Sequence, residues 1–215
     1  METKRRRTRR FFIAVGALCV LGVAFAVLVL RGVLVLNTPS RADYPVWGVD
    51  VSHYQGEIDW EALRAQGVRF AFIKATEGSS HVDERFAQNA GEALAAGVPA
   101  GAYHFFSFES PGQTQAENLL SALEGREFAL PCAVDFEFYG AFFENPPDLE
   151  DTRAELRAML EAVEAETGRK PLLYATWRSY RMYLMGAFDD YPLWIRDVYL
   201  WPGLTLPNRD WTFWQ

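Results

Sequence analysis

Two carboxylates, Asp135 and Glu137, lie one residue apart in an otherwise apolar stretch, "LPCAVDFEFYG" at residues 130–140. If this stretch is a strand, both side chains project from the same face, because side chains alternate along a strand. Two like charges at that spacing, about 7 Å between Cα atoms, are costly in a low dielectric unless one carboxyl keeps its proton. Such a pair suits general acid–base chemistry. The alternative is an edge strand whose acidic face is solvated.

Further strands and helices alternate around this stretch. Strands are predicted at 46–52, 69–76, 99–108, 170–176, 191–198 and 210–215, and helices at 60–66, 84–97, 110–123, 148–168 and 178–186. Asp59 is expected to cap the helix at 60–66, and Pro111 to occupy the first position of the helix at 110–123. Strands alternating with helices indicate an α/β fold with a parallel sheet and right-handed crossovers. Seven candidate strands favour an eight-stranded barrel over a flat sheet. In such a barrel the working residues gather at the C-terminal ends of the strands.

The predicted strand ends place acids among aromatic side chains. The candidates at these ends are Asp50, Lys74, Tyr103, His104, Asp135, Glu137, Tyr174, Trp194, Arg196 and Trp214. Carboxylates perform acid–base chemistry, and flat aromatic faces hold sugar rings. The sequence has no nucleophile elbow, glycine-rich phosphate loop or HExxH motif, and its three histidines lack metal-ligand spacing. We therefore expect neither a cofactor nor a metal.

The N-terminal residues have a different composition. Residues 1–10 contain six basic side chains and one acid, and Phe11–Leu30 is a run of 20 uncharged residues, which is long enough to cross a membrane. Basic residues before an apolar run predict a cytoplasmic N-terminus and an exported remainder. The alternative is a cleaved signal peptide, because "AFA" at 24–26 resembles a cleavage site. We favour an uncleaved anchor, since the apolar run continues beyond it.

The predicted organisation is a basic cytoplasmic tail (1–10), a transmembrane signal-anchor (11–36), a linker (37–45) and one exported domain (46–215). Residues 1–31 carry seven bases and one acid, so with a total charge of −7 the remainder carries −13. Such an acidic domain is not expected to bind nucleic acid by neutralising phosphates. Cys19 and Cys132 lie in different regions, so no disulfide framework is predicted. We expect a monomer in the cell membrane, or a secreted one if the anchor is cleaved.

Seven motifs, taken in order, resemble glycoside hydrolase family 25, the N-acetylmuramidase type of lysozyme. They are "GVDVSHYQGEIDW" (48–60), "FIKATEG" (72–78), "GAYHFF" (101–106), "AVDFEF" (133–138), "PLLYAT" (171–176), "PLWI" (192–195) and "WTFWQ" (211–215). The resemblance covers residues 46–215. A lone D-x-E would be weak support, whereas seven motifs at barrel-compatible spacing are strong support.

The resemblance implies a modified TIM-like barrel of five β/α units followed by further β-strands. It also implies hydrolysis of the β-1,4 bond between N-acetylmuramic acid and N-acetylglucosamine in the glycan strands of bacterial peptidoglycan. By motif, Glu137 is the general acid, Asp135 orients the substrate N-acetyl group, and Asp50 is a third acid of less defined role. The expected substrate contacts are Tyr103, Tyr174, Trp194, Lys74, His104, Trp214 and Arg196.

The sequence departs from the family pattern at its end. The family normally continues through a Tyr-Ser and a hairpin to a last strand with another acid, whereas this sequence ends at "FWQ". We therefore expect an incomplete last strand and weaker barrel closure. A non-catalytic peptidoglycan-binding module is the alternative function. A chitinase-type hydrolase fits less well, because residues 131–134, "PCAV", lack that family's acidic run. The distance between the carboxyls, and with it the stereochemical outcome, stays open.

Overall fold

The computed structural model describes residues 2–31, 33–34 and 37–215, which fall into two units. One unit comprises Met1–Thr38 with Val198–Trp201, and the other comprises Pro39–Asp197 with Pro202–Gln215. We call the second unit the α/β domain, and the two are described separately.

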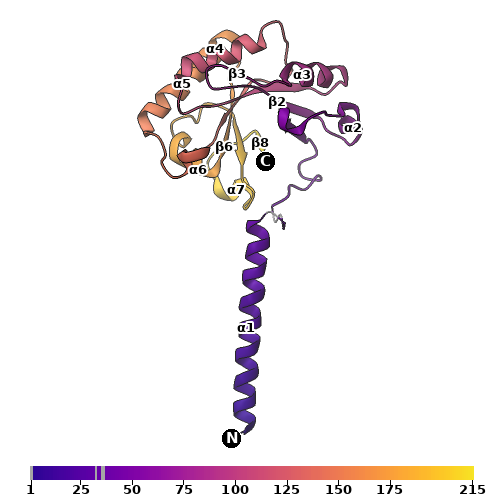
Figure 1. Cartoon of the computed structure of the whole chain (residues 1–215), viewed down its shortest axis with the longest axis vertical. Helices are drawn as coiled ribbons and strands as arrows, with labels where there is room; N and C mark the ends of the chain where they lie inside the picture. The colour runs from indigo at the N-terminus through magenta and orange to yellow at the C-terminus, as the bar shows by residue number, and fades with distance from the viewer. Residues whose placement is uncertain (1, 32, 35–36) are drawn as a thin grey trace. The chain divides into compact units, whose positions relative to one another are not determined.

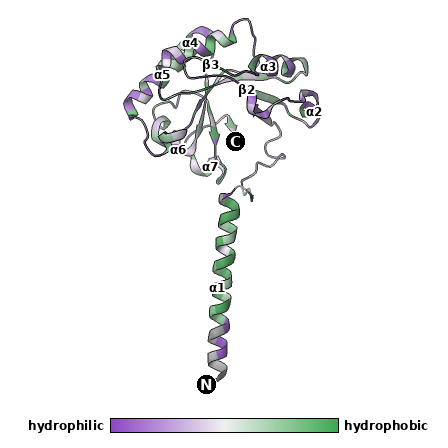
Figure 2. Cartoon of the chain, in the orientation of Figure 1, coloured by the Kyte–Doolittle hydropathy of each residue, from purple (hydrophilic) through white to green (hydrophobic). Residues whose placement is uncertain are grey.

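The first unit is dominated by one helix, α1 (Glu2–Leu30), of 29 residues (Figure 1). Within it, Arg10–Val29 has a mean hydropathy of 2.9 and is long and apolar enough to cross a membrane. Figure 2 shows the apolar colouring along most of α1 and hydrophilic colouring near its N-terminal end. The helix begins earlier than the predicted anchor, because the basic residues continue it. Residues 32 and 35–36 of the predicted anchor lie outside the described residues.

The α/β domain is built on one curled sheet. Its strands are β1 (Gly48–Val51), β2 (Phe70–Glu77), β3 (His81–Val82), β4 (Ala100–Phe105), β5 (Ala133–Phe136), β6 (Leu172–Thr176), β7 (Leu193–Arg196) and β8 (Phe213–Trp214). Seven of them pair in the order β1-β2-β4-β5-β6-β7-β8, and each of these pairings is parallel. All seven predicted strands are therefore present, and β1 and β8 form the edges of the sheet. The unpredicted β3 pairs antiparallel with the end of β2.

Helices lie between successive parallel strands of the sheet. They are α2 (Trp60–Ala65), α3 (Phe86–Ala95), α4 (Gly112–Leu123), α5 (Leu149–Thr167), the single turn α6 (Trp177–Ser179) and α7 (Pro202–Thr205). As predicted, Asp59 caps α2, its Oδ1 accepting from the Ala62 amide at 2.8 Å. In place of one helix at 178–186, α6 leads into a π-helical turn, Tyr180–Leu184.

Helices α4 and α5 lie side by side, and their contact depends on one glycine. A Cβ at Gly112 would lie 1.8 Å from the Glu155 carbonyl oxygen, so only glycine fits there. The Gly112 amide also donates to Glu155 Oε2 at 2.6 Å. Proline was expected at the first helical position, but Pro111 is the N-cap and α4 begins at Gly112.

Two hydrophobic clusters cover the two faces of the sheet. The larger lies between the sheet and the helices and includes Ile73, Leu119 and Leu160. The smaller lies on the inner face of the curled sheet and consists of Phe72, Ala133, Leu172, Tyr174 and Trp194. Phe72 and Ile73 are adjacent and wholly buried, one in each cluster. Side chains therefore alternate between the two faces of the sheet, and this alternation determines which of them point to its inner face.

Candidate active site

A hollow of about 210 Å³ opens on the inner face of the sheet, at the C-terminal ends of its strands. We call it the acidic pocket. It is lined by seven of the residues predicted from the sequence, Asp50, Lys74, Tyr103, Asp135, Glu137, Tyr174 and Trp194, and by Ser52, Tyr54, Phe105 and Ala133. Asp135 on β5 and Glu137 directly after it thus project toward the same side, as alternation requires.

The sheet register places these side chains in a row. Phe105 pairs with Asp135, Asp135 with Tyr174, and Tyr174 with Trp194. Residues in register on neighbouring parallel strands point to the same face, so the row follows from the pairing itself. Lys74 pairs with Tyr103 and Tyr103 pairs with Ala133, which forms a second row on the same face. The Trp194 ring packs on Phe72 at 4.9 Å and on Tyr174 at 4.8 Å between centroids, which fixes the pocket floor.

Asp135 is the most enclosed of the three acids. Its Oδ1 atom is buried and has no hydrogen-bond partner among the residues that the structure describes. Burial, followed by the charges of Glu137 and Asp50, raises the pKa of Asp135 well above its usual range, and Lys74 opposes this. A buried acceptor without a donor costs stability, so this oxygen is available to a ligand that brings an N–H or O–H group.

Glu137 and Asp50 are more accessible, and a cation acts on both. Burial raises the pKa of Glu137, and Asp50 adds to this effect, while Arg196 lowers it. Enclosure also raises the pKa of Asp50, again opposed by Arg196. Arg196 ends β7 and is exposed, two residues beyond Trp194. It does not line the pocket, but its positive charge acts on both carboxyls.

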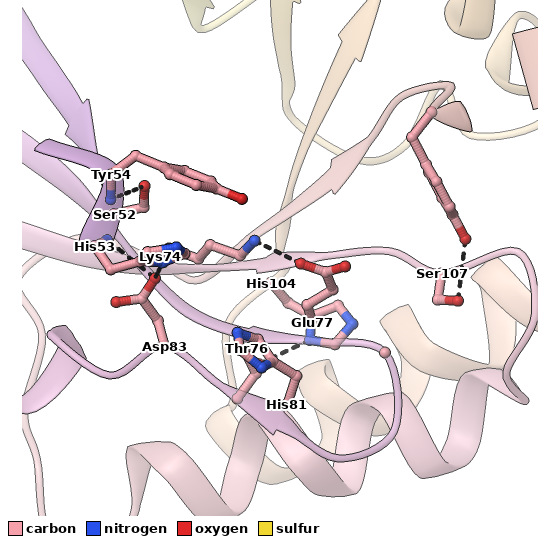
Figure 3. A network of polar contacts seen from close by, with 12 residues as sticks. Ser52, His53, Tyr54, Lys74, Thr76, Glu77, His81, Asp83, His104 and Ser107 are labelled. Atoms are coloured by element: carbon pink, nitrogen blue, oxygen red, sulfur yellow. Dashed lines mark hydrogen bonds and ion pairs between the residues drawn. The ribbon is translucent and has the colours of Figure 1, made fainter.

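The other polar groups of the pocket are neutral or paired. Lys74 is nearly buried, and its ammonium group lies 2.7 Å from Glu77 Oε2 and 5.0 Å from the Phe105 ring centroid (Figure 3). Burial and the neighbouring carboxylates raise the pKa values of the Tyr103 and Tyr174 phenols. Both hydroxyl groups therefore stay protonated and are able to donate hydrogen bonds.

Besides Arg196, two predicted contact residues lie outside the pocket, which corrects the expectation for them. His104 is wholly buried and does not line the pocket. Its Nδ1 lies 2.8 Å from Thr76 Oγ1 and its Nε2 lies 3.0 Å from Gln115 Oε1. The physical reason is alternation, since His104 lies between Tyr103 and Phe105, which both face the pocket, and must therefore face the helices.

Trp214 is displaced for the same reason. It pairs with Ile195 on the outer face, while the preceding Phe213 packs on the inner cluster. The Trp214 Nε1 group donates to the Asp197 carbonyl oxygen at 3.1 Å. Its ring lines a second hollow of about 310 Å³, between β1 and β8, which also includes Asp50 and Trp194 in its wall.

Tyr54 is a pocket residue that the sequence reasoning missed. Its side chain is 80% exposed, and its ring lies on the His53 ring at 4.0 Å between centroids. His53 is itself held by Asp83, whose Oδ2 lies 2.6 Å from His53 Nδ1 and accepts from the His53 amide at 3.1 Å (Figure 3). Tyr54 directly follows "DVSH", four residues after Asp50. This closeness to a predicted site residue at a strand end was the signal that could have identified Tyr54.

The pocket offers acids, phenols and aromatic faces for chemistry. Among the residues that the structure describes, no group of three or more His, Cys, Asp or Glu side chains is arranged to hold a metal ion. The Asp135, Glu137 and Asp50 carboxyls can donate or accept a proton, and the rings of Tyr54 and Trp194 can contact the flat face of a sugar.

Comparisons with known proteins agree with this geometry. The family model described as "Glycosyl hydrolases family 25" matches residues 49–215. The structure of a family 25 glycosyl hydrolase from Bacillus anthracis is 46% identical, with a TM-score of 0.75, and the match covers 79% of this chain and 78% of that one. The muramidase structure from Acremonium alcalophilum is 30% identical, with a TM-score of 0.70, over 79% and 86% of the two chains.

Curated relatives show the same similarity. YegX of Escherichia coli K12 is 35% identical over 182 residues, which is 81% of this chain and 64% of YegX. Lysozyme M1 of Streptomyces globisporus is 32% identical over 79% of this chain and 61% of its own length. The chain thus spans slightly less than two thirds of the length of these relatives. With the family match covering most of the sequence, and with the acid pair in one pocket, the chain belongs to glycosyl hydrolase family 25.

Proposed function

We propose that the α/β domain is a muramidase, a lysozyme that hydrolyses the β-1,4 bond between N-acetylmuramic acid and N-acetylglucosamine in peptidoglycan. The observation that carries this proposal is the pair Asp135 and Glu137 in one aromatic-lined pocket, with Asp135 Oδ1 buried and unpartnered within the described residues. Family membership supports it, as do relatives named lysozyme and N,O-diacetylmuramidase.

Glu137 is the proposed general acid. Its raised pKa lets it keep a proton at a pH where an ordinary glutamate has lost it. The proton passes to the glycosidic oxygen as the bond from that oxygen to C1 breaks, so the leaving sugar departs as a neutral alcohol. Glu137 is then ionised and can take a proton from the water that completes hydrolysis.

Asp135 is the proposed partner of the substrate acetamido group. An acetamido N–H group supplies the donor that Asp135 Oδ1 lacks in the described structure, and a donor favours the ionised carboxyl. Burial by itself favours protonation of Asp135. Substrate binding therefore moves Asp135 toward the anion, and the bound proton remains with Glu137. Asp50 is the proposed third acid of the site, and the positive charge of Arg196 favours the ionised form of Asp50. The proposed substrate contacts are Tyr103, Tyr174, Trp194 and Lys74.

The remaining assignments concern organisation. We propose that the curled sheet is the modified TIM-like barrel of the family, with residues 46–215 as the catalytic domain. We further propose that α1 anchors the chain in the cell membrane as a single span, with residues 1–10 in the cytoplasm, 37–45 as a linker, and a monomeric domain outside. The 20-residue span Arg10–Val29, uncharged apart from Arg10, and the preceding basic residues support this orientation.

The test is release of reducing ends from purified peptidoglycan. Glu137→Gln should lower the rate at least 10²-fold, because general acid catalysis contributes about 10²–10⁴-fold. Glu84→Gln is the matched control, since Glu84 is an exposed residue preceding α3, and it should retain full activity. Equal activity in Glu137→Gln and Glu84→Gln would refute the assignment. Sedimentation of the unaltered chain with insoluble peptidoglycan, without release of fragments, would instead favour the binding module.

A further inference from the structure

The two edge strands of the sheet approach one another at the acidic pocket. The second hollow lies between β1 and β8, and its walls include residues of both strands and of the segment before β1. We call residues 39–47 the strap. Asp50 and Trp194 line both this hollow and the acidic pocket. The hollow beside the strap therefore adjoins the pocket that contains the Asp50 carboxyl.

The strap packs on β8 through one aromatic side chain. The Tyr44 ring lies 5.4 Å from the Trp214 ring, edge to face, and 6.0 Å from the Trp211 ring. Arg41 lies 4.2 Å above the Trp47 ring, and the Trp47 carbonyl oxygen accepts from the Arg69 amide at 2.9 Å. The strap is therefore fixed to β8 at one point and to the start of β2 at another.

The end of β8 is held in place by its backbone. The Gln215 amide donates to the Ile195 carbonyl oxygen at 2.9 Å, and the Gln215 carbonyl oxygen accepts from the Asp197 amide at 2.9 Å. These two bonds flank the residue and fix the direction of its side chain. The Gln215 Nε2 group then donates to Asp50 Oδ1 at 3.0 Å, which links the two edge strands of the sheet.

We propose that Gln215 is a positioning residue that orients the Asp50 carboxylate, and that Tyr44 holds Gln215 in place by packing on Trp214. This inference rests on the proposed function of the acidic pocket. In this proposal the strap contributes to the catalytic site, whereas a simple linker would only connect the two units. The role differs from that of Arg196, which acts on Asp50 by charge at a distance, because the amide of Gln215 makes a directed contact.

A directed donor changes the titration of Asp50 in a predictable way. A hydrogen bond to the ionised carboxyl favours that form, so losing the donor raises the pKa of Asp50. The other groups that face Asp50 are Lys74 on β2, Tyr103 on β4, Asp135 on β5, Glu137 directly after β5, Tyr174 on β6 and Arg196 on β7. Gln215 is uncharged, so replacing it leaves their net charge unaltered.

The experiment titrates the Asp50 carboxyl carbon by NMR in the full chain held in detergent micelles. Gln215→Ala should raise the pKa of Asp50 by about 0.5 or more, since a donor to a carboxylate has an effect of that order. Gln88→Ala, an exposed glutamine on α3, is the matched control and should leave it unchanged. Tyr44→Ala should raise the pKa in the same direction by less, and Tyr44→Phe, which keeps the ring, should not.

The readout separates this inference from the proposed function. If folded Gln215→Ala titrates like the unaltered chain, the inference is overturned whether or not the chain hydrolyses peptidoglycan. If the pKa moves but the unaltered chain releases no fragments, the contact stands and the muramidase assignment fails. In an active chain, the acidic limb of kcat/KM should move upward with the pKa while KM stays within about twofold, as expected for a residue that orients a catalytic group. A shift with Gln215→Ala and none with Tyr44→Ala would remove the strap from the mechanism.

Discussion

Two polar clusters lie on opposite faces of the same strands. On the inner face, the acidic pocket has a buried carboxylate oxygen without a donor among the described residues. On the outer face, both ring nitrogens of His104 have partners, and Gln115 Nε2 donates to the carbonyl oxygens of Ser107 and Ser110. Burial is therefore common to both clusters, and hydrogen-bond satisfaction distinguishes them. The satisfied cluster ties β4 to α4, and the unsatisfied one is ready for a ligand.

The largest effect should come from removing the unsatisfied acid. Asp135→Asn removes the charge that we expect to hold the acetamido group, so hydrolysis of peptidoglycan should fall about 10²-fold or more. The same change should raise the melting temperature at pH 7, because a carboxyl with a raised pKa opposes folding when it is ionised. Asp151→Asn, at an exposed position on α5, is the control. A lower melting temperature for Asp135→Asn would contradict this account of the pocket.

The satisfied cluster should appear in the dependence of stability on pH. Burial lowers the pKa of His104 to about 4, so between pH 6.5 and 4 the unfolded chain binds a proton that the folded chain does not. Stability should fall as the pH falls through this window, by about 3 kcal/mol in all. Denaturant titrations at pH 7 and pH 4 measure the loss, and His104→Gln should reduce it. His81→Gln, at an exposed histidine, should not, and an equal reduction there would disconnect the effect from His104.

The smallest effect should come from the rim of the pocket. Tyr54→Ala should raise KM about fivefold with little change in kcat, because a lost ring contact costs about 1 kcal/mol. Tyr54→Phe keeps the ring on His53 and should behave like the unaltered chain. Steady-state kinetics on soluble peptidoglycan fragments measure both constants. A loss of kcat at constant KM would instead mean that Tyr54 acts at the reacting bond.

Local patterns predicted most of the fold. The seven parallel strands and the acid pair followed from apolar runs and from alternation, and the cap at Asp59 followed from its residue type. The errors concern faces and tertiary contacts. His104 and Trp214 were assigned by their proximity to strand ends, although alternation places each opposite its pocket-facing neighbour. The two-residue β3 and the contact of Tyr44 with Trp214 depend on pairing between distant residues, which no local pattern encodes.

Packing of the strap on β8 also limits how far the α/β domain can lie from the end of α1. Helix α1 ends at Leu30 and the strap begins at Pro39, so a tether of eight residues, 31–38, separates them. A fully extended chain of that length reaches at most about 29 Å. With α1 anchored as proposed, the domain could contact only the layer of cell wall next to the membrane. Glycan strands farther from the membrane would be out of its reach.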